Sequence, residues 1–172
     1  MKFLDENKKV IERGVIRAFS SAEFCFDSLE NMCANLNDAE SREETTSFLN
    51  LRWQEVSVSQ WQRHYGALYF FTDQAFRYYL PSIMLQALYN LDETHLAVGA
   101  LLSSLQSIED DQLGMWNRTR WLGLTVDQIK SVIDWLDFMK NPLLEYGFNE
   151  ECEASASNLR RMLVSPHSEK SP

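Results

Sequence analysis

One apolar stripe, between Phe76 and Leu91, constrains the fold of this chain more than any other feature of the sequence. Its members recur at three- and four-residue spacings, the periodicity of one face of an α-helix. They are Phe76, Tyr79, Leu80, Ile83, Met84, Ala87, Leu88 and Leu91. The opposite side of the same helix carries Tyr78, Ser82, Leu85 and Tyr89. A helix that is apolar nearly all round is typical of the centre of a helical domain, where it is covered on both sides.

Pro81 interrupts this stripe without changing its phase. A proline inside a helix removes the N–H that would bond the carbonyl of Arg77, and its ring crowds that carbonyl. The sequence leaves two arrangements open. Either one helix is kinked at Pro81, or a short helix ends near Tyr79 and a second begins with Pro81 in its first turn. Thr72 is the expected N-cap, with Asp73 favourably placed in the first turn.

Further helices are predicted on both sides of the stripe. They cover residues 6–19, 41–51, 57–68, 95–107, 126–140 and 149–164, while residues 20–37 are either irregular or helical. Three capping-box patterns support the starts: Ser41 with Glu44, Ser57 with Gln60, and Thr125 with Gln128. A small-residue face, Leu96, Gly99, Ala100 and Ser103, predicts a close helix contact. We expect one all-α domain over residues 1–164 and a disordered tail over 165–172.

Charge and hydropathy exclude several classes of protein. The net charge of −9 argues against nucleic-acid binding, which needs excess Lys and Arg to neutralise phosphates. The charged N-terminus is unlike a secretory signal, and the longest uncharged run, residues 94–108, is too short to span a membrane. We therefore expect a cytoplasmic protein without a membrane partner.

The sequence contains no recognisable catalytic or metal-binding pattern. His64, His95 and His167 are scattered, and the three cysteines lie at no metal-ligand spacing. We expect no metal, no cofactor and no enzymatic activity. The segment 115–121, "MWNRTRW", interleaves two arginines with two tryptophans, and we interpret it as Arg–Trp stacking within the fold rather than as a base-stacking surface.

Two sets of residues are candidates for binding a protein partner. The acidic cluster Glu109, Asp110 and Asp111 lies in a predicted loop between helices and suits a basic partner. Tyr78, Leu85 and Tyr89 lie on the second face of the central helix, and tyrosine is favoured in interface cores. Burial in the core is the first interpretation of the aromatic run, and an interface is the second.

Three segments of the chain carry a family resemblance. They are "RWQEVSVSQW", "ALYFFTDQAFRYYLPSIMLQAL" and "LGLTVDQIKSVIDWLDFM". The matching positions are Trp53, Phe76, Arg77, Tyr78, Tyr79, Leu80 and Pro81, then Leu124, Thr125 and Gln128. Over residues 8–140 the chain resembles a family of small bacterial proteins catalogued only as a domain of unknown function. The resemblance implies a bacterial source and an all-helical domain, and it brings no activity or catalytic residues with it.

These observations favour a non-catalytic protein-binding module, such as an immunity protein that neutralises a toxin. The alternatives are a structural or regulatory adaptor that acts as a homo-oligomer, and an enzyme of unrecognised type. A small acidic helical protein suits the first hypothesis because negative charge speeds the capture of a basic partner.

Overall fold

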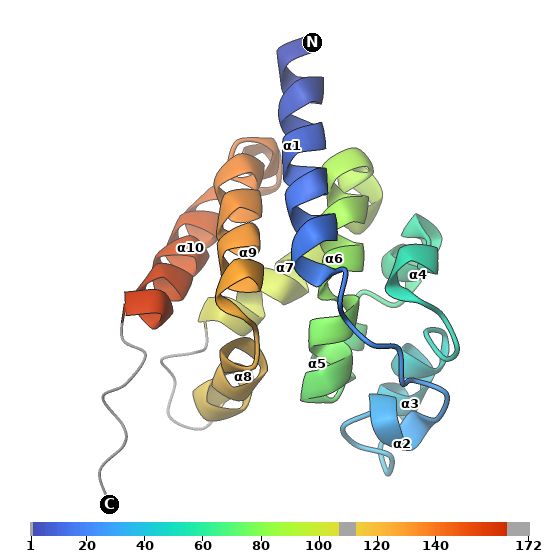
Figure 1. The fold of residues 1–172 in the computed structure, drawn as a ribbon. Helices are drawn as coiled ribbons and strands as arrows, with labels where there is room; N and C mark the ends of the chain where they lie inside the picture. Colours follow the sequence, from blue (N-terminus) through green and yellow to red (C-terminus); the bar gives the residue numbers. More distant parts are fainter. Residues whose placement is uncertain (1, 107–112, 165–172) are drawn as a thin grey trace, which may run out of the picture.

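The computed structural model describes residues 2–106 and 113–164 (Figure 1). Over these residues the chain forms ten α-helices, two 3₁₀ helices and one isolated β-bridge, Cys33 with Phe71. The elements are α1 (Lys2–Phe19), α2 (Leu29–Met32), α3 (Ala39–Thr46), η1 (Trp53–Glu55), α4 (Val58–Arg63), α5 (Ala67–Phe70), α6 (Asp73–Tyr89), α7 (Leu91–Gln106), α8 (Leu113–Leu122), α9 (Val126–Met139), η3 (Pro142–Tyr146) and α10 (Asn149–Val164). The predicted all-α class is confirmed. The predicted tail, 165–172, lies outside the described residues.

Helix α6 lies at the centre of the arrangement (Figure 1). It packs against α1, α2, α7, α8 and η1. Helix α9 lies between α1 and α10, and α7 links α10 on one side to α4 and α5 on the other. The apolar side chains of all these helices join one buried cluster, so the described chain has a single core.

The apolar stripe of α6 is buried as the sequence predicts. Phe76, Tyr79, Leu80, Ile83 and Met84 are fully buried. The helix runs continuously from Asp73 to Tyr89 with Pro81 inside it, so the one-helix arrangement is the correct one. Thr72 caps the helix by accepting a hydrogen bond from the Ala75 N–H, also as predicted. The Tyr79 hydroxyl donates to the carbonyls of Phe48 and Leu51, at 2.8 and 2.9 Å, and so ties α6 to the segment after α3.

Three buried tryptophans, on α4, α8 and α9, connect these helices to α6 or α7 through hydrogen bonds donated by their indole N–H groups. Trp61 of α4 donates to Ser82 Oγ at 2.9 Å. Trp135 of α9 donates to the Met84 carbonyl at 2.8 Å, and Trp121 of α8 donates to Ser104 Oγ at 3.3 Å. Because a buried indole keeps its hydrogen bond, these large rings add apolar contact area without an unpaired polar group.

The Arg–Trp segment is used inside the fold, as predicted, through the contacts of Arg120 and Trp121. Arg120 and Trp121 are both fully buried. The Arg120 guanidinium lies 5.2 Å from the centre of the Phe76 ring, and Trp121 meets the same ring edge-on. Phe76 of α6 therefore contacts both the arginine and the tryptophan of this segment. Arg118 is exposed, and the Trp116 side chain lies outside the described residues.

The N-terminal half departs most from the predicted helix boundaries. Asp38, not Ser41, caps α3: its carboxylate accepts from the Ser41 N–H at 2.8 Å, so Ser41 lies inside the helix. The predicted helix 57–68 is two helices, α4 and α5, because residues 64–66 are not helical. Residues 20–37 are irregular except for α2. The capping boxes at Ser57 and Thr125 are both formed.

Helix α7 begins at Leu91, four residues earlier than predicted, and its buried face also differs. Leu96 and Ser103 are exposed, whereas Ala97, Val98 and Leu101 are buried. The small-residue prediction was therefore wrong for two of its four positions. Gly99 does permit a close contact, since a Cβ atom there would lie 3.1 Å from the Phe148 ring. In the described part of the chain, no helix is long and apolar enough to cross a membrane.

Candidate functional site

The candidate residues identified in the sequence do not share one surface. Glu109, Asp110 and Asp111 lie outside the described residues. Tyr78 is 5 % exposed, and Leu85 is half-buried against the core, whereas Tyr89 is 50 % exposed. The three lie along one side of α6, but the segment before α2 covers the N-terminal part of that side.

The cover over Tyr78 is aromatic. The rings of Phe24 and Phe26 lie 5.8 and 5.1 Å from the Tyr78 ring, centre to centre. Burial raises the pKa of the Tyr78 hydroxyl above its ordinary value. Of the three predicted residues, Tyr89 alone has a ring that remains half accessible.

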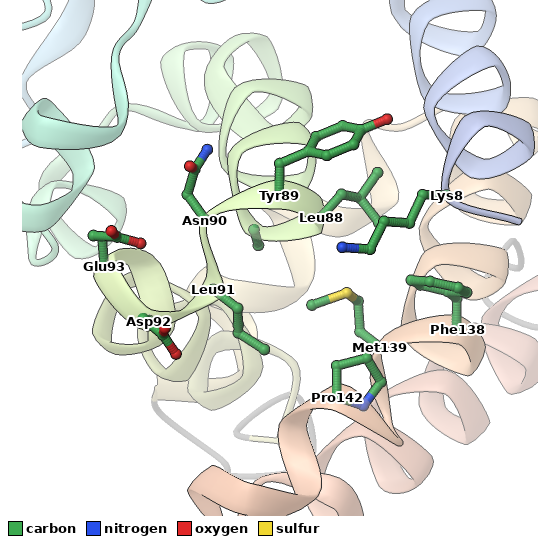
Figure 2. Close-up of a pocket in the computed structure, with 11 residues that line it drawn as sticks. Lys8, Leu88, Tyr89, Asn90, Leu91, Asp92, Glu93, Phe138, Met139 and Pro142 are labelled. Carbon is green, nitrogen blue, oxygen red and sulfur yellow. The ribbon is translucent and has the colours of Figure 1, made fainter. Parts of the chain in front are cut away.

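Tyr89 borders a hollow of about 320 Å³ between α1, the α6–α7 junction and the end of α9 (Figure 2). Buried Leu88 and Met139 form the floor of this hollow, and Leu91, Phe138 and Pro142 form its apolar sides. Volumes of this order are typical of sites that hold a small ligand or one anchoring side chain. We call this feature the Tyr89 hollow.

The hollow opens beside the sharp turn between α6 and α7, and Asn90 forms this turn. Its backbone leaves the helical region, at φ −134° and ψ 50°, so α6 ends and α7 begins within two residues. The Asn90 N–H still bonds the Gln86 carbonyl, and the Asn90 amide donates to Gln86 Oε1 at 3.2 Å. Thr94 then bonds the Asn90 carbonyl through both its backbone N–H and its hydroxyl. The turn is therefore fixed by hydrogen bonds on both sides.

Helix α1 places one charged group at the hollow. Lys8 Nζ lies 5.5 Å from the centre of the Tyr89 ring, and in Figure 2 it points into the space above Met139. One turn later on the same face, Glu12 accepts a hydrogen bond of 2.7 Å from the Tyr89 hydroxyl. This bond to a carboxylate raises the pKa of Tyr89 to about 12. Helix α1 therefore contacts Tyr89 at its hydroxyl, through Glu12, and at its ring face, through Lys8.

Two acidic residues at the start of α7, Asp92 and Glu93, also line the hollow. Asp92 accepts a hydrogen bond from the Tyr146 hydroxyl, which raises the pKa of Tyr146 to about 12. His95 stacks on the Tyr146 ring at 5.0 Å, and its Nδ1 lies 2.7 Å from the Asp92 carbonyl oxygen. Neither carboxylate forms an ion pair with Lys8.

The remaining titratable groups do not converge on the hollow. Cys33 and Cys152 are buried, and burial raises the pKa of Cys152 to about 12, so its thiol is a poor nucleophile at neutral pH. His64 lies 3.7 Å from Glu44, and neither residue lines the hollow. Within the described ranges, no three His, Cys, Asp or Glu side chains are grouped so as to hold a metal ion. The hollow therefore combines a floor of buried apolar side chains, an accessible tyrosine ring and one ammonium group with the polar residues Asn90, Asp92 and Glu93 at its edge.

Sequence reasoning found Tyr89 but missed Lys8, Phe138 and Pro142. These residues come from helices that are far apart in the chain, and each has an ordinary local pattern. The one available signal was the Tyr-Asn-Leu-Asp sequence at 89–92, where asparagine and aspartate follow an apolar helix and predict a helix boundary.

Comparison with known families is informative for most of the chain. The model of a family of unknown function, DUF6714, matches residues 26–157. The chain belongs to DUF6714. The family assignment from the sequence is thus confirmed, although the DUF6714 match begins later than the predicted residue 8 and continues past residue 140 into α10. It covers α6, α7 and α9 of the hollow but not Lys8 and Glu12 of α1. No curated protein and no solved structure matches the chain.

Proposed function

We propose that this protein is a non-catalytic protein-binding module that holds its partner at the Tyr89 hollow. The observation that carries the proposal is the fixed, half-exposed Tyr89 ring, held by Glu12 at its hydroxyl and by Lys8 over its face. Tyrosine is enriched among the residues that dominate binding energy. A ring that is already held in place loses little conformational freedom on binding, which favours affinity.

We propose further that the partner has a basic surface and that this module is a bacterial immunity protein, acting in the cytoplasm against a toxin. The support is the net charge of −9, since a strongly negative protein attracts a basic one over long distances. The acidic cluster Glu109, Asp110 and Asp111 would add to this attraction. Association with such a partner slows as salt rises, because salt screens exposed charges beyond about 8 Å at physiological ionic strength.

The test is affinity capture from the source organism with three baits: the wild-type chain, Tyr89→Ala and Tyr65→Ala. Tyr65 is the matched control, because its side chain is 46 % exposed and lies outside the hollow. We expect the wild type and Tyr65→Ala to recover the same protein and Tyr89→Ala to lose it. Equal recovery by all three baits would contradict the proposed site.

Sedimentation of the purified chain tests the alternative of an adaptor that acts as a homo-oligomer. A monomer that captures a different protein supports the binding module. A stable homodimer that is lost in Tyr89→Ala would instead identify the hollow as a self-association surface. A toxin gene beside the gene for this chain would support the immunity role.

A further inference from the structure

We propose that the Tyr89 hollow binds a chain end: the C-terminal carboxylate of the partner, with an apolar last side chain, bound by Lys8. This inference rests on the proposed function and names the part of the partner that enters the site. It follows from the charge, the walls and the size of the hollow.

The first observation is an ammonium group that faces the hollow without a carboxylate partner. Lys8 is half-buried, and the ion pairs between described residues do not include it. Its contact is with the Tyr89 ring, 5.5 Å away. A cation over an aromatic face keeps its charge and its hydrogen-bonding capacity, so Lys8 can still pair with an anion.

The second observation is that two of the acidic groups beside the hollow already accept hydrogen bonds from tyrosine hydroxyls. Glu12 accepts from Tyr89, and Asp92 accepts from Tyr146. A carboxylate from outside would therefore not have to displace either group from Lys8.

The third observation is the nature and size of the walls. Beside the ammonium lie the apolar side chains of Leu88, Leu91, Phe138 and Met139, and the polar residues Asn90, Asp92 and Glu93 complete a mixed lining. An apolar cavity of about 150 Å³ is enough for benzene, so a hollow of about 320 Å³ has room for one aromatic or aliphatic side chain and a carboxylate. An ammonium group beside these four apolar side chains suits the end of a peptide chain, a recognised mode of capture.

Two related probes test this: a short peptide that ends in phenylalanine with a free carboxylate, and the same peptide with an amidated end. Binding is followed by NMR of the full chain, labelled at its methionine methyl groups. The Met139 methyl reports on the hollow, and Met32, buried beside α2, is the internal control. We expect saturable shifts at Met139 alone, with a Kd of about 1 mM or tighter for the free acid. The amide should bind at least about tenfold more weakly, the equivalent of one charge-assisted contact.

Matched variants assign the effect to one residue. Lys8→Met keeps the length of the side chain and removes its charge, and it should weaken binding of the free acid at least about tenfold. Lys9→Met, on the exposed side of the same helix, should change the Kd less than about twofold. Equal binding of acid and amide, or equal binding by Lys8→Met and the wild type, would overturn the carboxylate assignment. No saturable shift at Met139 would overturn the site.

A third probe, 3-phenylpropanoate, separates a chain end from a free small acid. If it shifts Met139 and the free-acid peptide does not, the proposal of a chain end is wrong and the hollow is a small-molecule site. These outcomes are distinct from failure of the proposed function, which the capture experiment with Tyr89→Ala measures independently of any peptide.

Discussion

Arg120 of α8 and Asp73 of α6 form an ion pair, with Nε 3.3 Å from Oδ1, in which the guanidinium is fully buried and the carboxylate is 36 % exposed. The same guanidinium donates to the carbonyls of Leu68, Tyr69 and Phe71 at the end of α5. Burial lowers the pKa of Arg120 to about 10, and Asp73 opposes that effect, so the group is charged at neutral pH. One side chain therefore joins α5, α6 and α8.

Arg120→Ala should reduce the free energy of unfolding by about 3–5 kcal/mol, the usual cost of removing one partner from a buried ion pair. The reason is that three carbonyl groups and Asp73 lose their shared donor. Urea unfolding monitored by circular dichroism measures the loss. Arg118→Ala, an exposed arginine on the same helix, is the control and should stay within about 0.5 kcal/mol of the wild type. Equal effects of the two substitutions would contradict this role for Arg120.

Two glycines should respond to alanine in opposite directions. A Cβ atom at Gly123 would lie 2.3 Å from Arg77 Nη1, which donates to the carbonyls of Thr119 and Arg120 near the end of α8. Gly123→Ala should therefore displace Arg77 and cost about 1 kcal/mol. Gly14, inside α1, has nothing within 4 Å of such a Cβ atom, so Gly14→Ala should gain about 0.5–1 kcal/mol. Thermal unfolding measures both changes in stability. If both variants were stabilised, or both destabilised, relative to the wild type, this reasoning would be wrong.

Truncations in the stripe of α6 should be costly. Leu80 and Ile83 are fully buried, and replacing either with alanine should cost about 2–5 kcal/mol. Leu96→Ala, on a side chain that is 49 % exposed, should cost less than about 0.5 kcal/mol. Chemical unfolding of the three variants shows whether the two buried positions cost more stability than the exposed one. A loss below about 0.5 kcal/mol at both buried positions would mean that the stripe is not core.

Glu44 should make stability fall as pH rises. Burial raises the pKa of Glu44 above its ordinary value of 4.5, with His64 opposing the shift. The folded state therefore binds the proton more tightly than the unfolded state, so this group lowers stability as pH rises from about 4.5 to its raised folded value. Glu44→Gln should remove that fall and gain stability relative to the wild type at neutral pH. The free energy of unfolding of the wild type and of Glu44→Gln, measured from pH 4 to pH 7, tests this sign. If Glu44→Gln lost as much stability over this range as the wild type, the prediction would be contradicted.

The sequence was most informative where local pattern and burial agree. The α6 stripe, the Thr72 cap, α9 and α10 follow from periodicity and capping, because each of these signals lies within a few residues. The helix boundaries predicted between residues 38 and 70 were less accurate. There Asp38 competes with Ser41 as a cap, and short helices depend on tertiary contacts more than on propensity.

The hollow could be predicted only in part. Tyr89 was identifiable as a surface candidate, but the cover over Tyr78 by Phe24 and Phe26 comes from a segment whose path the sequence left open. Lys8 and Phe138 reach the hollow from helices separated by more than a hundred residues. Such contacts depend on how the helices pack, which no local signal specifies.

The central claim, that the partner is held at the Tyr89 hollow, is tested most directly by site-specific photo-crosslinking. A photoreactive phenylalanine derivative replaces Tyr89 in one variant and Tyr65 in another, two tyrosines of similar exposure at 50 % and 46 %. Both variants are expressed in the source organism, and crosslinked products are identified by mass spectrometry. We expect one protein to be crosslinked from position 89 and not from position 65. Crosslinks from position 65 to that protein, with none from position 89, would contradict the account.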